Sequence, residues 1–362
     1  MKPSDLRIHI RQLCCLGVGG EQLMPALLKA VRMLVGADSA AFFWVDASGE
    51  MTSLFAERLL PAPVRQVYFE RFYDSGEASF KRAFAERVRQ PESVLAVSAS
   101  RDAEQSDYYN EVMRHLDAYH VLYGIVREQG RAIGQLSLYR PKSAHTYGPA
   151  ERAELVSIMR YVSHGVCNRA REGGGQPFVD SGDDAVLVVS ESGDLRQLPA
   201  PAQKLLALAA QGRIGPGDSL ADMALAAQPM LRQLVARLRE GLAGADVGPP
   251  SAIVDNRWGR FVLRAYALSD DPAANDAAFA VRIQRQEPML LSFVDALAGF
   301  SLSPQQREIA AGLARGASNQ EIAKALGLSG NTVAYHIKQL FARLDTHDRQ
   351  AMVGKVLGRA NA

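Results

Sequence analysis

The amino-acid sequence predicts a multidomain α+β protein that ends in an all-helical domain. The chain has 362 residues, and a domain usually holds about 100–200 residues, so two or three units are expected. Two groups of strand-like runs stand on either side of a glycine-rich stretch at 171–184. After Ser301 the strand pattern stops, and signals for helix starts and ends take over. We therefore expect two mixed domains followed by a small helical one.

The first predicted domain covers residues 1–170. Apolar residues at helical spacing predict a helix at 21–35, and AAFFWV predicts a strand at 40–45. Two later strands, VLYGIVRE and AIGQLSLYR, are joined by the turn QGR, and a helix with Pro149 in its first turn closes the segment. This order of helix, hairpin, loops, hairpin and closing helix resembles a GAF-type α/β sensor domain.

A linker and a second domain are predicted next. The stretch 171–183 holds four glycines, a proline and acidic residues, as interdomain linkers do. Over 184–287 a strand, an ESGD turn, a short strand, a helix and a later antiparallel pair resemble a PAS-type α+β domain, with a hairpin loop at 269–276. The pattern has no diagnostic haem or flavin residue, so no cofactor is expected. Residues 288–300 predict a connecting helix that leads into the last domain, 301–362.

Capping residues mark the helices of the last domain. Ser303, followed by a proline, can cap the first of them. Ser318 and Glu321 have the spacing of a capping box, in which the hydroxyl accepts a backbone N–H and the carboxylate reaches back. Gly327 suits a left-handed turn, and Ser329 can cap the following helix. The segment is expected to be an all-α unit of four helices containing a helix-turn-helix, whose second helix enters the DNA major groove.

The run from Leu302 to Val353 resembles the carboxy-terminal DNA-binding domain of LuxR-type transcription factors. The matching residues keep the family's spacing without a break: Leu302, Pro304, Arg307 to Ile309, Gly316, Ser318, Asn319, Glu321 to Ala323, Leu326, Gly327, Ser329, Thr332, Val333, His336, Leu344 and Arg349. The resemblance implies that the domain binds double-stranded DNA and that the chain is a transcription regulator.

By this resemblance, contacts to DNA come from two helix starts and one helix face. Val333 recurs at the helical spacing of the core residues but falls early on the exposed side of its helix, so it could belong to either. By the resemblance it would offer methyl groups to a thymine, and Lys338 and Arg343 would contact phosphates. The full predicted set is Ser318, Asn319, Thr332, Val333, Tyr335, His336, Lys338, Gln339 and Arg343. The alternative is a helical unit that has partly lost DNA binding and docks another protein.

The sequence departs from the LuxR pattern at three positions. Ala334 stands where the family usually has a lysine, and Gln305 and Gln306 stand where arginine and glutamate are usual. Losing the lysine removes one cationic contact to DNA, so affinity or base preference is expected to differ from that of relatives.

The last predicted helix carries an apolar face formed by Met352, Val353, Val356 and Leu357. In the LuxR family this helix pairs two copies, which implies a homodimer on an inverted-repeat operator with half-sites about 10 base pairs apart. RNA polymerase would be a further partner if the protein is an activator. The alternative is a helix that packs only on its own chain.

Aromatic and hydroxyl side chains in the first domain are candidates for a pocket that binds a small, partly apolar or aromatic effector. They lie on the first strand, on a following helix and on the later hairpin. The candidates are Phe42, Trp44, Tyr68, Phe72, Tyr73, Tyr123, Ser137 and Tyr139. The alternative is that they are ordinary core residues.

Two other kinds of input are disfavoured. The first 130 residues lack the acidic cluster and the central aspartate of a phosphorylated receiver domain. Acyl-homoserine-lactone sensors of the LuxR family carry tryptophans in their pocket, whereas this chain has only Trp44 and Trp258, although VRQVYFERFYD is faintly similar to their pocket helix.

Charge and composition indicate which kind of partner the protein binds and where in the cell it is expected. Residues 301–362 carry eight Lys or Arg against four Asp or Glu, a net of +4, while the first 300 residues carry 33 against 35. A basic tail on a mildly acidic body suits a module that binds a polyanion. No apolar run approaches the roughly 18 residues of a membrane helix, and no signal peptide is present, so a cytoplasmic protein is expected.

No pattern of catalytic or metal-binding residues is present. The sequence has no nucleophile elbow, P-loop, zinc signature or paired carboxylates, so an enzyme is not expected. Cys14 and Cys15 leave a redox switch open as an alternative input, although neighbouring residues of a helix point about 100° apart and an apolar flank raises a thiol pKa.

Overall fold

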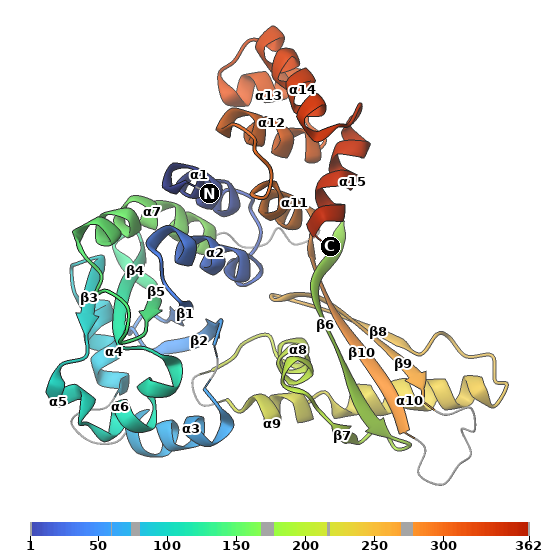
Figure 1. Cartoon of the computed structure of the whole chain (residues 1–362). Helices are drawn as coiled ribbons and strands as arrows, with labels where there is room; N and C mark the ends of the chain where they lie inside the picture. The colour runs from blue at the N-terminus through green and yellow to red at the C-terminus, as the bar shows by residue number, and fades with distance from the viewer. Residues whose placement is uncertain are drawn as a thin grey trace. The chain divides into compact units, whose positions relative to one another are not determined.

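The computed structural model describes residues 2–58, 60–73, 80–167, 177–215, 218–268 and 278–360. The chain folds into two compact units (Figure 1). The first unit comprises Met1–Glu172, Arg213–Gly217 and Ala298–Glu308, and the second comprises Gly173–Gly212, Asp218–Leu297 and Ile309–Ala362.

The first unit is built on a five-stranded antiparallel sheet with the order β2-β1-β5-β4-β3. Its strands are β1 (Ser39–Val45), β2 (Met51–Ala56), β3 (Val94–Ser98), β4 (His120–Glu128) and β5 (Arg131–Arg140). The predicted strand at 40–45 and both strands of the later hairpin are confirmed. β5 is the central strand, with β1 beside it, and residues on both faces of β5 are buried: Leu136 and Leu138 on one face, Gln135 and Ser137 on the other.

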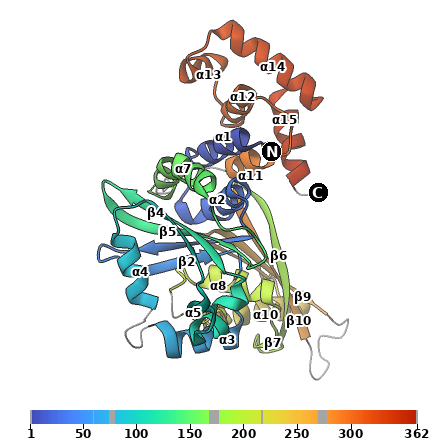
Figure 2. The same ribbon diagram turned by 60° about the vertical axis from the view of Figure 1, so that its left-hand side comes forward.

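Helices cover both faces of this sheet (Figures 1 and 2). One face carries α1 (Pro3–Cys14), α2 (Gly20–Val35) and α7 (Pro149–Cys167). The other carries α3 (Ala62–Val67), the π-helix η1 (Tyr68–Tyr73), α4 (Phe80–Arg89), α5 (Arg101–Glu104), α6 (Asp107–Glu111) and the 3-10 helix η2 (Met113–Leu116). The predicted helix at 21–35 and the closing helix are confirmed, whereas α1 is an addition to the prediction.

The second unit holds a five-stranded antiparallel sheet with the order β7-β6-β10-β9-β8. Its strands are β6 (Phe178–Ser190), β7 (Leu195–Gln197), β8 (Ser251–Asn256), β9 (Gly259–Ala267) and β10 (Ala278–Pro288). Counted within its own domain, this order is the same as that of the first sheet. One face is covered by α8 (Ala200–Ala210), α9 (Leu220–Leu225) and α10 (Gln228–Leu242). The predicted mixed helix and sheet fold is thus confirmed for both domains, and their common strand order is an addition to the prediction.

The predicted linker 171–183 is wrong in its second half, because β6 already begins at Phe178. Gln284 pairs with Asp184 and Gln286 with Asp180, so three residues of β6 stand opposite the single residue Arg285. Gly182 has a φ of 80° at this bulge. A glycine with acidic neighbours is typical of both a turn and a β-bulge, which explains the error. The predicted linker residues 171–176 and the loop at 269–276 lie outside the described residues.

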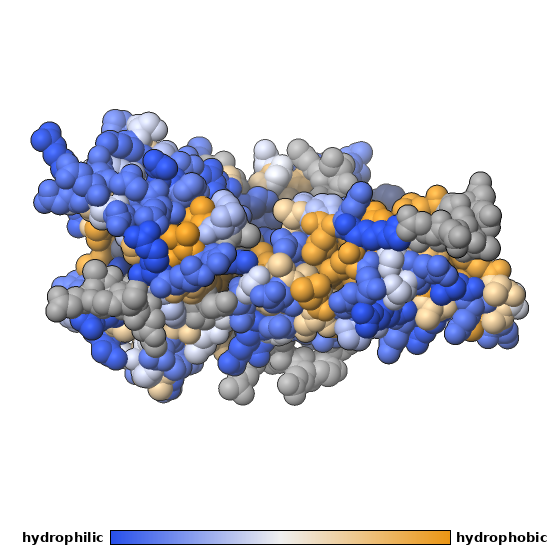
Figure 3. All heavy atoms as spheres, turned by 90° about the horizontal axis from the view of Figure 1, so that it is seen from below, coloured by the Kyte–Doolittle hydropathy of each residue, from blue (hydrophilic) through white to orange (hydrophobic). Residues whose placement is uncertain are grey.

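On the other face of the second sheet, several apolar side chains of the strands are exposed. Val186, Ile253 and Tyr266 are exposed by 51%, 64% and 46%. On the side of the molecule that Figure 3 shows, apolar residues reach the surface in separate groups among hydrophilic ones. Within the described ranges no helix is both long enough and apolar enough to cross a membrane.

The chain ends in five helices. They are α11 (Met289–Leu297), α12 (Pro304–Ala314), α13 (Asn319–Leu326), α14 (Gly330–Leu344) and α15 (Arg349–Ala360). The connecting helix predicted at 288–300 is α11, and the four helices predicted after it are all present. Leu340, Leu344 and Ile322 form part of the small core between them.

Candidate nucleic-acid interface

The tight turn between α13 and α14 is fixed by the capping groups that the sequence predicted. The Ser318 hydroxyl accepts a hydrogen bond from the Glu321 backbone N–H at 3.3 Å, and the Glu321 carboxylate accepts one from the Ser318 N–H at 2.7 Å. These hydrogen bonds lower the pKa of Glu321. Gly327 ends α13 with a φ of 64°, and the Ser329 hydroxyl accepts from the Thr332 N–H at 3.1 Å. Two helices are therefore joined by Gly327, Leu328 and Ser329 alone.

One face of α14 is polar and open. Asn331, Ala334, Tyr335 and Lys338 are all exposed, and their spacing of three or four residues places them on one stripe. Tyr335 is 59% exposed, and its hydroxyl accepts a hydrogen bond from the Gln339 side chain at 2.6 Å. We refer to these four residues as the α14 stripe. Asn331 was not predicted, although the helical spacing from Tyr335 and Lys338 could have found it.

Other predicted DNA-contact residues differ in how much surface they present. Ser318, Asn319 and Arg343 are exposed, whereas Thr332, His336 and Gln339 are half-buried. The Thr332 and Ser329 hydroxyls hydrogen-bond to each other at 2.8 Å, so the threonine side chain supports the helix start.

Val333 corrects the prediction. Its exposed fraction is 0%, so it cannot offer methyl groups to a thymine in this conformation. Position 333 lies one residue before Ala334 of the stripe, and this step of about 100° around the helix turns its side chain inward. Val333 is a core residue that holds α14 in place.

Replacing Val333 with threonine keeps the side-chain shape but buries a hydroxyl. We expect the free energy of unfolding of the helical domain to fall by about 1–3 kcal/mol, because the hydroxyl loses its water. Thermal denaturation followed by circular dichroism measures this, with the exposed neighbour substitution Ala334→Thr as the control. An unchanged melting temperature with weaker binding to DNA would show instead that Val333 contacts a base.

The apolar face of α15 is also used within the chain. Met352 and Val356 both have exposed fractions of 0%, and α15 packs against α11 in the second unit. In this conformation α15 is packed on its own chain, so the pairing of two copies through these two side chains stays a prediction. Val353 and Leu357 of the predicted set are half-buried.

The predicted effector residues separate into two groups on opposite faces of the first sheet. Phe42 and Trp44 share a face with Gly134, since a Cβ on this glycine would lie 2.3 Å from the Phe42 ring. Leu136, the cross-strand partner of Phe42, pairs in turn with Gly124, which faces Met159 of α7. Phe42 and Trp44 therefore belong to the core beneath α7 and are not part of a site with the other candidates.

The remaining candidates gather on the opposite face of the sheet with residues that were not predicted. Tyr123 and Ser137 are cross-strand neighbours, and Tyr139 follows on the same face of β5. Tyr68, Phe72 and Tyr73 of η1 lie near Tyr108 of α6, with the ring centroids of Phe72 and Tyr108 5.4 Å apart. Burial raises the pKa of Tyr68, Tyr108, Tyr123 and Tyr139. We call Tyr68, Tyr108, Tyr123, Tyr139, Ser137 and Arg87 the tyrosine cluster.

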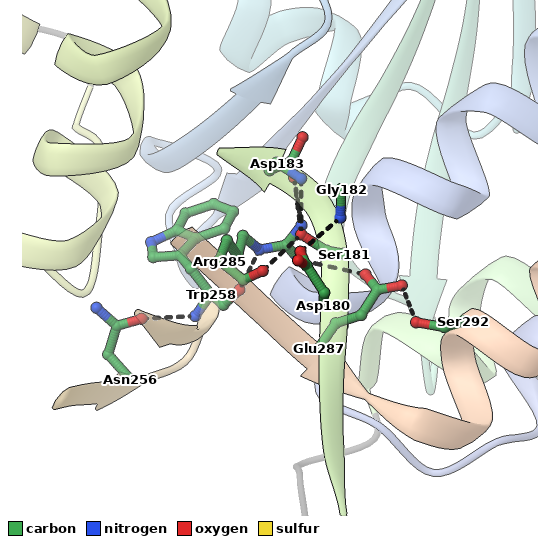
Figure 4. Close-up of polar contacts among 9 residues, drawn as sticks. All are labelled: Asp180, Ser181, Gly182, Asp183, Asn256, Trp258, Arg285, Glu287 and Ser292. Atoms are coloured by element: carbon green, nitrogen blue, oxygen red, sulfur yellow. Dashed lines mark hydrogen bonds and ion pairs between the residues drawn. The ribbon is translucent and has the colours of Figure 1, made fainter. Parts of the chain in front are cut away.

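A second polar cluster lies where β10 meets α11 (Figure 4). Arg285 is 4% exposed; its Nε donates to the Trp258 carbonyl at 2.8 Å, and its Nη1 lies 2.9 Å from Asp183 Oδ2. Glu287 lies 3.8 Å from Arg285 Nη2 and accepts a hydrogen bond of 2.6 Å from the Ser292 hydroxyl of α11. The cluster therefore ties the bulge of β6 and the end of β10 to the first turn of α11.

Glu287 makes stability depend on pH. Burial raises the pKa of Glu287 above its ordinary value of 4.5, against the opposing effect of Arg285 and Ser292. Because the folded protein holds this proton more tightly, the stabilisation is complete below pH 4.5 and is lost as pH rises through the folded pKa. We expect Glu287→Gln to gain stability relative to the wild type as pH rises, measured by urea unfolding at several pH values. The exposed Glu240→Gln is the control, and equal slopes for the two variants would contradict the role of Glu287.

The cysteines give little support to the hypothesis of a redox switch. Cys14 is buried, and burial followed by the charge of Cys15 raises its pKa, which keeps the thiol protonated and unreactive. Burial and a hydrogen bond with Glu128 raise the pKa of Cys167 to about 11. Cys15 is exposed. Among the described residues no three His, Cys, Asp or Glu side chains converge on a metal position.

Two short helices joined by a capped glycine turn, with an exposed polar stripe on the second, define a helix-turn-helix domain. Residues 300–356 match the sequence model of the bacterial regulatory proteins of the luxR family. This part of the chain is therefore a LuxR-family DNA-binding domain, as the sequence resemblance predicted.

The curated relatives match the same region. YhjB of Escherichia coli (strain K12), described as an HTH-type transcriptional regulator, is 49% identical over 49 residues, which is 14% of this chain and 24% of YhjB. The transcriptional regulatory protein SgaR of Hyphomicrobium methylovorum is 43% identical over 53 residues, which is 15% of this chain and 25% of SgaR. The chain thus spans about a quarter of the length of these relatives.

Solved structures resemble the chain only loosely. The photoproduct state of GAF3 from Slr1393 of Synechocystis sp. PCC6803 has a TM-score of 0.31 and 18% identity, covering 40% of this chain and 91% of that one. The bacteriophytochrome RpBphP3 from R. palustris has a TM-score of 0.29 and 11% identity, covering 99% of this chain and 75% of that one.

Proposed function

We propose that the protein is a transcription regulator that binds DNA through α13 and α14 and is controlled by a small-molecule effector. The observation that carries the proposal is the exposed α14 stripe beside a fixed, capped turn, within a domain of the LuxR family. The stripe's hydrogen-bonding groups and the Lys338 charge suit base edges and phosphates. The protein is not an enzyme in this proposal, and it works in the cytoplasm.

Control by the effector would act through the first unit. The tyrosine cluster is the proposed binding site, and the effector would shift the balance between conformations that bind DNA well and poorly. A homodimer on an inverted repeat, with RNA polymerase as a partner if the protein activates, completes the proposal. Since Met352 and Val356 are buried against the rest of their own chain, pairing through them requires α15 to change its packing.

Capture of genomic DNA fragments by the purified protein tests the proposal. The expected result is a set of fragments that share one sequence, arranged as an inverted repeat with half-site centres about 10 base pairs apart. Fragments without a common site, bound with equal affinity, would contradict it.

Restoring the family's lysine at position 334 is expected to strengthen DNA binding. Ala334 is exposed on the α14 stripe, so Ala334→Lys adds a charge beside DNA without disturbing the core. Affinity for a captured fragment should rise about tenfold at low salt, and the salt slope should steepen by about one. Fluorescence anisotropy at several salt concentrations measures both. The same charge added at exposed Gln350 is the control, and equal gains from the two variants would contradict a specific role for position 334.

A further inference from the structure

The tyrosine cluster holds a cation that has no counter-charge. Arg87 of α4 is half-buried, and its guanidinium carbon lies 4.1 Å from the centre of the Tyr123 ring. Its Nη1 donates to the Gln135 side chain at 3.3 Å. Among the described residues no carboxylate lies within ion-pair distance of this guanidinium. A half-buried cation with no carboxylate partner, placed beside phenol hydroxyls, suits an anion as its partner.

Two hydrogen bonds in series link Arg87 to side chains of β5, and in each the residue nearer to Arg87 is the donor. Arg87 donates to Gln135, and the Gln135 amide donates to the Ser137 hydroxyl at 3.0 Å. Tyr139 follows Ser137 on the same face of β5. The Tyr139 hydroxyl can donate its proton to a ligand on this face. Gln135 and Ser137 are 1% and 0% exposed, so the chain of hydrogen bonds is fixed within the domain.

A second hydroxyl is available nearby. Tyr123 makes no hydrogen bond with any described residue, and its ring lies under the Arg87 guanidinium. Burial raises the pKa of Tyr123, yet the side chain keeps some accessible surface, as do Tyr108 and Tyr139. These three rings are therefore within reach of a ligand. The Tyr123 hydroxyl is thus free to donate to a ligand.

The surrounding rings favour a flat ligand. Phe72 and Tyr108 lie 5.4 Å apart at 63°, and Tyr68 and Tyr108 lie 6.4 Å apart, so the far side of the cluster is aromatic. Aromatic rings at such spacings attract another ring edge-to-face or offset. A guanidinium fork beside two hydroxyl donors matches a carboxylate.

The geometry points to a small aromatic carboxylate as the effector, with its carboxylate on Arg87, Tyr123 and Tyr139 and its ring against Phe72 and Tyr108. This inference rests on the proposed function, in that it names the chemical class of the effector.

Benzoate and benzamide, which share a shape and differ in charge, test the inference by calorimetric titration into the full chain. Benzoate is expected to bind at least tenfold more tightly than benzamide. Arg87→Gln should abolish that preference, Arg87→Lys should keep part of it, and Tyr123→Phe should weaken benzoate several-fold. Exposed Arg82 on the same helix provides the control, Arg82→Gln, which should bind like the wild type. Melting curves establish that each variant is folded.

Three results would overturn the inference: no benzoate binding to the wild type, equal affinity for benzamide, or a preference that survives in folded Arg87→Gln. Operator affinity measured in the same samples separates this inference from the proposed function. If benzamide binds equally and changes operator affinity, the regulator proposal stands and the anion site fails. If benzoate binds as expected and operator affinity is unchanged, the anion site stands and effector control fails.

Discussion

Replacing Arg285 with leucine is expected to lower the free energy of unfolding of the second unit by about 3–5 kcal/mol, because a buried ion pair loses one partner. The change leaves Glu287 desolvated and removes the hydrogen bond to the Trp258 carbonyl. A loss of this size is a large part of the roughly 5–15 kcal/mol that stabilises a typical domain. Tryptophan fluorescence in urea measures it, with Trp44→Phe as the background so that Trp258 reports alone.

Arg282 on the same strand provides the control for Arg285. It pairs with Asp184 at 2.6 Å, but both side chains are more than 40% exposed, so Arg282→Leu should cost less than about 1 kcal/mol. The double change of Arg285 and Glu287 to leucine should recover part of the loss, because it removes the unpaired charge. Equal losses from Arg282→Leu and Arg285→Leu would show that burial of the cluster does not matter.

Removing the two largest side chains of the α14 stripe is expected to reduce operator affinity by about 100-fold, because a phosphate contact and a base-reading contact are lost together. The variant is Tyr335→Ala with Lys338→Ala, and its salt slope should fall by about one. Both side chains are exposed, so the melting temperature should change little. Anisotropy titrations at several salt concentrations measure the affinity.

Lys355 provides the matched control for Lys338. It is an exposed lysine of α15 that pairs with Asp345 at 3.2 Å, away from the stripe. Lys355→Ala removes the same charge and should leave the salt slope unchanged. If Lys338→Ala alone and Lys355→Ala lower affinity equally, the binding would be explained by general attraction to a polyanion and not by contact with the groove.

Local signals predicted the helical domain well. The capping box of Ser318 and Glu321 and the glycine at 327 act between residues a few positions apart, so their pattern fixes the ends of α13 without any tertiary information. Val333 was harder, because a single helical step separates an inward from an outward side chain. The spacing of Val333 from Leu340 and Leu344 put it with the core, whereas the LuxR resemblance put it at the groove, and the packing of α14 decides between them.

The sensor candidates show a different limit. Strand alternation predicts that Phe42 and Trp44 share a face, and that Ser137 and Tyr139 share one, but not that the two faces are opposite. That relation follows from the register of β1 on β5, which depends on the whole sheet. Gln135 could have been found by alternation from Ser137. Arg87 could not, because α4 reaches the sheet only through tertiary packing.

The strand order of the second sheet has a consequence for how the chain is assembled. Its first and last strands, β6 and β10, are neighbours at the centre, and the Met289 N–H donates to the Pro177 carbonyl at 2.9 Å. The residues at which the polypeptide enters and leaves this domain are therefore joined by a hydrogen bond. Apart from Arg213–Gly217, which belongs to the first unit, the chain between these two residues forms a domain that begins and ends on neighbouring strands. Because its two ends are adjacent, such a domain can be inserted, lost or exchanged in evolution while the chain segments before and after it remain close together.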